Sequence, residues 1–181
     1  MVSWIVWPDE KERSTKPHEI SLKGTRTAPA GATLKGRAVS ALRLSTQQQQ
    51  TLRAAVDRII PPDDYPGAWE SGVCDYLERQ FEKDLRPVLG SYRAGLTAIE
   101  AESVARFQQG FSLISDEQRD AVLGSIEAGE VLTVWEVEPR YFFDLLVNTT
   151  AEGYYSNPEQ GGNRNAVSWI MTGFEEARPT D

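Results

Sequence analysis

Two adjacent carboxylates, Asp63 and Asp64, are the residues whose type and spacing come closest to a reaction centre. A carboxylate pair can exchange protons with a substrate or hold a hard cation. The pair stands between prolines in the segment PPDDYPG, where aspartate also commonly caps a turn. No third oxygen ligand follows at a fixed spacing, so the sequence favours the turn. An enzyme that uses Asp63 and Asp64 stays open as an alternative.

Cysteine and histidine are too scarce for the common nucleophile and metal sites. The chain has one cysteine, Cys74, and one histidine, His18. These numbers exclude an internal disulfide, a cysteine-based metal cage and a histidine-centred triad. The run Gly161-Gly162-Asn163 resembles a phosphate-binding turn, but no strand precedes it and no lysine pattern follows it. We therefore expect no catalytic residue, no metal site and no cofactor in this chain.

Aromatic residues in or beside loops indicate a different role, because tyrosine and tryptophan are frequent anchors of protein–protein contacts. Two such loops occur, PPDDYPG and the stretch GYYSNPEQGGNRNAVSWIMTG over residues 153–173. We expect six of their residues to lie on or beside a contact surface: Tyr65, Trp69, Tyr154, Tyr155, Asn163 and Trp169. Packing in a core is the alternative for any aromatic side chain.

The stretch 153–173 has its own positioning devices. Gly153 is suited to ending a helix, and the pair Gly161-Gly162 permits backbone angles that other residues avoid. Asn163 or Asn165 can cap a short closing helix that carries Trp169. We expect a shaped loop between two helices.

Helix-start patterns divide the rest of the chain. Ser45 with Gln48, or Thr46 with Gln49, forms a capping box for a helix that ends before Pro61. A second capping box, Ser115 with Gln118, opens a helix that ends at Gly129.

Three further helices follow from apolar periodicity. One comes after PPDDYPG. Another contains Gly95, and Asp84 can cap it, with Pro87 close to its first turn. A third has Pro139 in its first turn. Gly95 indicates a close helix contact, because glycine costs about 1 kcal/mol against alanine inside a helix. The pairs Glu100/Glu102 and Asp116/Glu117 are expected on solvated helix faces. Only VLTVW at 131–135 resembles a strand. The fold class is therefore all-α, an orthogonal bundle of about six helices.

Charge divides the 181-residue chain into an arm and a body. Residues 1–44 contain eight Lys/Arg against four Asp/Glu, whereas residues 45–181 contain eleven against twenty-three. We expect a mobile basic arm over 1–44, a helical domain over 45–175 and a frayed tail over 176–181. The acidic body argues against nucleic-acid binding, and no apolar run reaches the length of a membrane span.

The order of several short motifs is similar to that of a known family. The motifs are Asp57, Ile59-Ile60-Pro61, Pro66-Gly67-Ala68, Gly72-Val73, Tyr92, Gly95-Leu96, Ile99, Phe111, Leu113, Phe142-Phe143, Thr149-Thr150, Gly153 to Pro158, Gly161-Gly162-Asn163, Trp169 and Gly173. Over residues 46–174 this chain resembles the gluconate 2-dehydrogenase subunit 3 family, the small subunit of bacterial FAD-dependent sugar and polyol dehydrogenases.

The resemblance implies a non-catalytic subunit that binds a flavoprotein of the glucose–methanol–choline type and supports its maturation. FAD would belong to that partner, and a haem c subunit often completes such complexes. The family implies a periplasmic location, whereas the lack of an export signal in this sequence predicts a cytoplasmic one. A free-standing helical interaction module is the other non-enzymatic alternative.

Overall fold

The computed structural model describes residues 43–174, and in that range all regular structure is helical, with no strand. Six α-helices lie in this described range: α2 (Thr46–Ile59), α3 (Val73–Phe81), α4 (Leu89–Phe107), α5 (Asp116–Ala128), α6 (Pro139–Tyr155) and α7 (Val167–Thr172). Four 3₁₀ turns join them: η1 (Arg86–Val88), η2 (Phe111–Leu113), η3 (Pro158–Gln160) and η4 (Arg164–Ala166). The all-α prediction is confirmed. The expected arm, except for its last two residues, and the tail after 175 lie outside the described residues.

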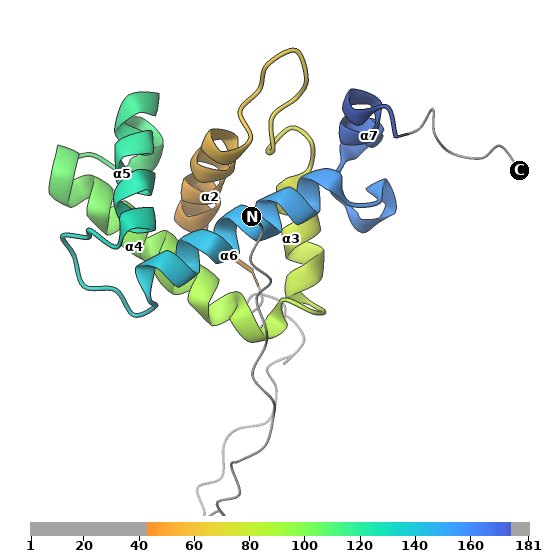
Figure 1. The fold of residues 1–181 in the computed structure, drawn as a ribbon. Helices are drawn as coiled ribbons and strands as arrows, with labels where there is room; N and C mark the ends of the chain where they lie inside the picture. The colour runs from red at the N-terminus through yellow and green to blue at the C-terminus, as the bar shows by residue number, and fades with distance from the viewer. Residues whose placement is uncertain (1–42, 175–181) are drawn as a thin grey trace, which may run out of the picture. The chain divides into compact units, whose positions relative to one another are not determined.

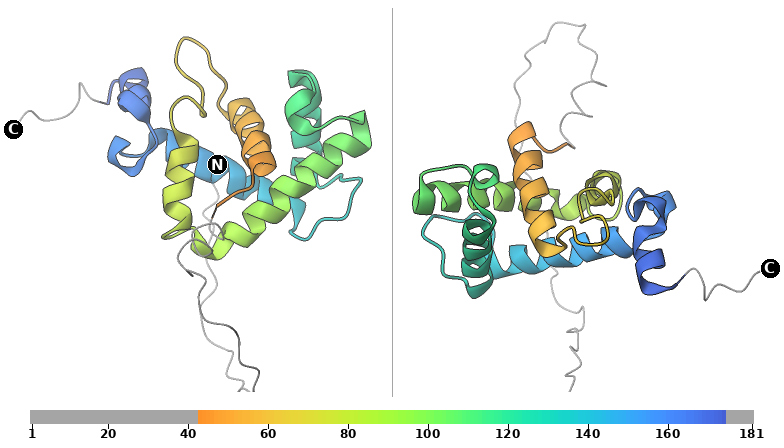
Figure 2. Two further views of the ribbon diagram at one scale, coloured as in Figure 1. Left: turned by 180° about the vertical axis from the view of Figure 1, so that it is seen from behind. Right: turned by 90° about the horizontal axis from the view of Figure 1, so that it is seen from above.

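The long helices α4 and α6 cross at the core, and α2, α3 and α5 pack around them, as Figures 1 and 2 show. Gly95 on α4 makes this crossing possible, because a Cβ at that position would overlap the ring of Phe142 on α6. The close helix contact expected at Gly95 is confirmed. Tyr92 lies one turn earlier on α4, fully buried, and its ring packs edge-on against Phe81 and Phe142.

Both predicted capping boxes are present. Ser45 and Gln48 exchange hydrogen bonds of 2.9 and 3.2 Å at the start of α2, and Ser115 and Gln118 do so at 3.0 and 3.3 Å at the start of α5. Each box satisfies two backbone N–H groups that the first helical turn leaves without a carbonyl partner.

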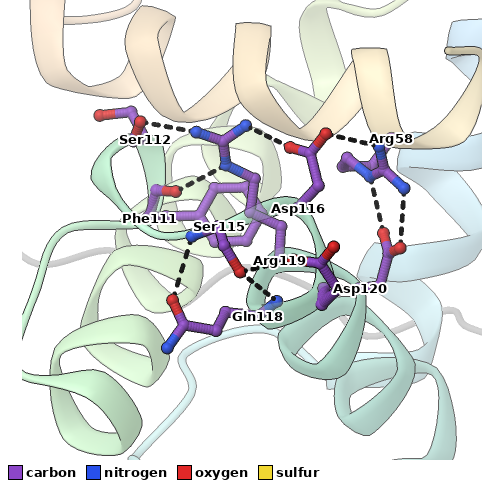
Figure 3. A network of polar contacts seen from close by, with 9 residues as sticks. Arg58, Phe111, Ser112, Ser115, Asp116, Gln118, Arg119 and Asp120 are labelled. Carbon is purple, nitrogen blue, oxygen red and sulfur yellow. Dashed lines mark hydrogen bonds and ion pairs between the residues drawn. The ribbon is translucent and has the colours of Figure 1, made fainter.

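Ion pairs fix α5 against α2 (Figure 3). Arg58 of α2 donates two hydrogen bonds to the Asp120 carboxylate, from Nε at 2.8 Å and from Nη2 at 2.7 Å. Its Nη1 donates to the Asp116 carboxylate at 3.0 Å. Arg119 pairs with Asp116 and donates to the carbonyl oxygens of Phe111 and Ser112 in η2. The Arg58 guanidinium holds the pKa of Asp120 below its ordinary value. Asp116 and Glu117 are exposed, as expected of a solvated face, and Asp116 also takes part in this network of ion pairs.

Three local predictions are wrong. Asp84 does not cap α4, because the turn η1 precedes that helix and its N-cap is Val88, which makes no side-chain cap bond. Gly153 does not end α6, which continues to Tyr155. The segment 131–135 is not a strand, because no neighbouring strand pairs with it in the described part of the chain.

Candidate functional site

The loop between α6 and α7 lies against the turn that leads into α3. The Tyr154 hydroxyl, at the end of α6, donates to the carbonyl oxygen of Pro66 at 3.0 Å. The backbone N–H of Arg164 donates to the carbonyl oxygen of Ser71 at 2.9 Å. Burial raises the pKa of Tyr154 above its ordinary value, so its hydroxyl stays protonated as a donor. These bonds join segments that lie about ninety residues apart in the chain.

Asn163 holds the loop together from inside. Its side chain is fully buried, its Nδ2 donates to the carbonyl oxygen of Ser156 at 2.9 Å, and its Oδ1 accepts from the backbone N–H of Ser168 at 2.9 Å. The second bond satisfies an N–H of the first turn of α7. The expected N-cap is nevertheless wrong, because the N-cap of α7 is Ala166, which makes no side-chain cap bond, and Asn163 reaches this N–H from outside the N-cap position. Asn163 also adopts a left-handed backbone, a conformation that asparagine tolerates better than most residues.

Close backbone packing completes the loop. A Cβ on Gly162 would overlap the carbonyl oxygen of Gly153, and a Cβ on Gly153 would lie 2.9 Å from the ring of Tyr76. Gly153 is therefore required for packing inside α6 and not for ending the helix. Gly161 has φ +106°, which favours glycine, and forms the turn that leads into Gly162.

Two arginines tie the outer edge of the loop to α3. Arg164 donates to the carbonyl oxygen of Glu70 at 3.0 Å and pairs with Asp75 at 2.8 Å. Arg79 donates to the carbonyl oxygen of Glu159 at 2.8 Å. The pair with Asp75 is half exposed and contributes little by itself, but together these bonds fix where the loop lies.

The fixed loop presents a group of apolar side chains to solvent. Tyr155, Ile170 and Phe174 are each about half exposed, at 50%, 57% and 50%. Trp169 contacts two of them. Its ring centroid lies 5.2 Å from that of Phe174, and its Nε1 donates to the Tyr155 carbonyl oxygen at 3.4 Å. We call these four residues the C-terminal aromatic surface. Figure 1 places its helix, α7, beyond the end of α6.

The six residues predicted for a contact surface have different positions. Tyr155 and Trp169 belong to the C-terminal aromatic surface. Tyr154 and Asn163 are buried at 2% and 0% exposure, so they support the surface from below and cannot touch a partner in this conformation. Both therefore lie beside this surface, and a contact of any of the six residues with a partner stays a prediction.

The remaining two, Tyr65 and Trp69, are half-buried on the turn between α2 and α3. Trp69 packs against the core, and the guanidinium of Arg53 lies over its ring at 5.3 Å. Its backbone N–H donates to Asp57 at 2.8 Å. Tyr65 and Trp69 thus keep part of their surface available.

The carboxylates Asp63 and Asp64 have the geometry of a turn. Asp63 Oδ1 accepts from the backbone N–H of Tyr65 at 2.8 Å, and both aspartates are exposed. Among the described residues, no group of three or more His, Cys, Asp or Glu side chains is placed to hold a metal ion. Burial, with the nearby Glu78 and Asp75, raises the pKa of Cys74 to about 12, so this thiol is protonated at neutral pH.

Glu102 is the residue that sequence reasoning missed. It was expected on a solvated face of α4, yet its side chain is fully buried. Its carboxylate accepts from the backbone N–H groups of Leu132 and Thr133, the Thr133 hydroxyl and Trp135 Nε1, at 2.6 to 3.3 Å. Its position three residues after the buried Ile99 places it on the buried stripe of α4, a signal that could have identified it.

None of the helices in residues 43–174 combines the length and the apolar composition that crossing a bilayer requires. The fold and the loop together define a small all-α domain that presents a supported aromatic surface. The chain belongs to the gluconate 2-dehydrogenase subunit 3 family, whose model matches residues 46–175 and confirms the resemblance read from the sequence. Searches of curated proteins and of solved structures returned no match.

Proposed function

We propose that this chain is a non-catalytic small subunit that binds a flavin-dependent sugar or polyol dehydrogenase of the glucose–methanol–choline type. FAD and the substrate pocket belong to that partner, and a haem c subunit is a further member of the complex. Membership in the gluconate 2-dehydrogenase subunit 3 family is the single observation that carries this proposal.

The C-terminal aromatic surface supports the proposal physically. It places the half-exposed side chains of Tyr155 and Phe174 near the partly exposed ring of Trp169. Aromatic side chains of this kind dominate the free energy of many protein contacts. The bonds of Asn163, Tyr154 and Arg164 hold the loop in one conformation before binding. Such preorganisation lowers the entropy lost on association.

Mass action explains how a bound subunit supports maturation of the flavoprotein. A subunit that binds the folded flavoprotein and not its unfolded chain lowers the free energy of the folded state by RT ln(1 + [L]/Kd). At a concentration a hundred times Kd this stabilisation is about 2.7 kcal/mol, which is a large part of the stability of a typical domain. The folded flavoprotein then persists long enough to take up FAD.

The double variant Tyr155→Ala/Trp169→Ala tests the surface. Co-expressed with a glucose–methanol–choline-type flavoprotein from the same genome, it should lose at least tenfold in co-purification relative to the unaltered chain. Leu113→Ala is the matched control, because Leu113 is 76% exposed on η2, outside this surface. Circular dichroism of each purified variant checks that the helices persist. Equal retention of the double variant and the control removes Tyr155 and Trp169 from the interface.

A further inference from the structure

The chain enters α7 through a backbone conformation that its residue types do not favour. Asn165 and Ala166, directly before the helix, are both left-handed, with φ of 59° and 54°, and Asn163 has φ 46°. Asparagine tolerates this conformation, whereas alanine has no polar side-chain group that compensates for the crowding of its Cβ. Left-handed residues also normally occur singly and not in succession. Ala166 is therefore a strained position.

The same region contains a polar group that is buried at a cost. Ser168, the second residue of α7, has no exposed surface, and its hydroxyl has no hydrogen-bond partner among the described residues. A buried hydroxyl without a partner loses its bonds to water and gains none in exchange. The position of α7 against the bundle thus carries two costs, a strained backbone and an unsatisfied hydroxyl.

The contacts that offset these costs are modest. The helix has the sequence VSWIMT, which contains no charged residue and therefore forms no ion pair. It packs chiefly against α6 and η4, and of its residues only Val167 and Ser168 are buried. Figures 1 and 2 show α7 at the edge of the bundle, beyond the end of α6. A short peripheral helix of this kind separates from a domain more easily than a core helix unfolds.

A relaxed backbone would give α7 a better start. With a right-handed backbone, Ala166 becomes the first residue of the helix and Asn165 takes the N-cap position. The Asn165 side chain is then placed to accept from the backbone N–H of Val167 or Ser168, in place of the bond that Asn163 now makes. Local sequence therefore favours a start at Asn165, which the observed position of α7 prevents. Conflicts of this kind occur at switch regions and other functional sites.

We infer that Ala166 is a hinge and that α7 exchanges between two positions. In the docked position, which the structure shows, Ala166 is left-handed and the Ser168 hydroxyl is buried. In the released position, Ala166 is right-handed, Asn165 replaces Asn163 as the cap, and water reaches the Ser168 hydroxyl. The helices α2 to α6 stay folded in both positions.

This exchange acts on the C-terminal aromatic surface. Tyr155 belongs to α6, which keeps its place, whereas Trp169 and Ile170 are carried by α7. Release therefore divides the surface, and docking assembles it. A ligand that contacts both parts binds the docked position and shifts the population toward it. The inference concerns the isolated chain and does not depend on the proposed function.

Hydrogen exchange of the isolated full-length chain tests whether α7 is released separately. A helix of this length does not persist alone in water, so the amides of Met171 and Thr172 exchange after release. Their exchange should be faster than that of Leu96 and Ile99 in α4 and should not respond to low urea, because the opening exposes little surface. If Met171 and Thr172 exchange as slowly as the core amides, α7 opens only with the whole domain and the inference is overturned.

Ala166→Gly tests the hinge itself, because glycine adopts a left-handed backbone without strain. The variant favours the docked position, although the freedom of glycine in the released position reduces the gain. Exchange of Met171 and Thr172 should slow by about fivefold. Ala105→Gly, at an exposed alanine inside α4, is the control and should leave this exchange within about twofold. Unchanged or faster exchange in Ala166→Gly overturns the inference.

Ser168→Ala gives an independent readout. It removes the unsatisfied hydroxyl from the docked position, so exchange of the α7 amides should again slow by about fivefold. Circular dichroism should show the helix content of the unaltered chain. Faster exchange in this variant would mean that the hydroxyl stabilises the docked position, and it would contradict the cost assigned to it.

Discussion

Replacing Glu102 tests how strongly one buried carboxylate orders the surface of this domain. The carboxylate has no exposed area. It accepts hydrogen bonds from four donors in the loop formed by residues 131–136, in addition to the guanidinium of Arg106. Glu102→Ala leaves these donors without an acceptor. Glu102→Gln keeps a carbonyl oxygen that can take the place of Oε1, where all four loop donors converge, but it removes the charge.

The geometry sets the size of the expected effects. A hydrogen bond to a charged group contributes about 1.5–3 kcal/mol, and removing one partner of a buried charged network costs about 3–5 kcal/mol. The donors of the loop lie near the surface and can become hydrated when Glu102 is removed, which favours the low end. We expect Glu102→Ala to lower the free energy of unfolding by about 3 kcal/mol and Glu102→Gln by about 1–2 kcal/mol.

Urea unfolding followed by tryptophan fluorescence measures these differences, with Glu127→Gln as the control. Glu127 is exposed on α5, so its replacement should change the free energy of unfolding by less than about 0.5 kcal/mol. Hydrogen exchange of the Leu132 and Thr133 amides should accelerate in both Glu102 variants. A cost below about 1 kcal/mol for Glu102→Ala, with slow exchange retained, refutes the anchoring role.

The lowered pKa of Glu102 predicts the direction in which stability changes with pH. Burial alone would raise the pKa of Glu102, but the hydrogen bonds from Thr133, Leu132 and Trp135 outweigh it and hold this pKa below its ordinary value. A lowered pKa in the folded state stabilises the fold above the pKa of the unfolded chain, about 4.3, and this stabilisation disappears as the pH falls through the folded value. The difference in the free energy of unfolding between the unaltered chain and Glu102→Gln should therefore become smaller at acidic pH.

Three further predictions concern other positions. Gly95→Ala should lower the free energy of unfolding in urea by about 1–3 kcal/mol, because the added methyl group meets Phe142. Gly124→Ala is the control, because open space surrounds Gly124 on α5, and it should raise this free energy by about 0.5–1 kcal/mol. Equal effects of the two substitutions contradict the close helix crossing at Gly95. Gly162→Ala should displace the loop after α6 and weaken flavoprotein binding with α2 to α6 intact by circular dichroism, and normal binding argues against a fixed loop. The Cys74 thiol, with a pKa raised to about 12, is ionised to about one part in ten thousand at pH 8, so its reaction with a disulfide reagent should be slow in the folded chain and fast in urea; rapid reaction without urea refutes its protected state.

Much of the fold could be predicted from local sequence. Capping boxes such as Ser45 with Gln48 and Ser115 with Gln118 are short-range devices, and the chain makes both of them as expected. Gly95 was informative for a similar reason, because glycine inside an apolar helical stripe is costly unless another helix needs the space. For the capping boxes the determining interaction lies within one helical turn, whereas Gly95 indicates only that another helix comes close and does not identify Phe142.

Predictions were wrong where the partner of a residue lies far away in the sequence. The segment 131–135 has the composition and alternation of a strand, yet its donors meet the carboxylate of Glu102, about thirty residues earlier. Gly153 looked like a helix end, but a side chain at this position would meet Tyr76 and Val73 of α3. Such contacts depend on how the helices come together.

The candidate surface shows the same division. Tyr154 and Tyr155 are adjacent and chemically identical, but the phase of α6 buries the first against the turn at Pro66 and leaves the second half exposed. Composition could indicate an aromatic contact surface in this region. Only the three-dimensional arrangement separates the side chains that support it from those that a partner can reach.

Flavin loading tests the central claim most directly. A glucose–methanol–choline-type flavoprotein from the same genome is expressed with and without this chain, and the FAD bound per purified flavoprotein is measured together with the turnover of each preparation. The account predicts that FAD content and sugar or polyol oxidation rise when this chain is present, and that the purified chain alone has no such activity. Equal FAD content and activity without the chain, or oxidation by the chain alone, would contradict it.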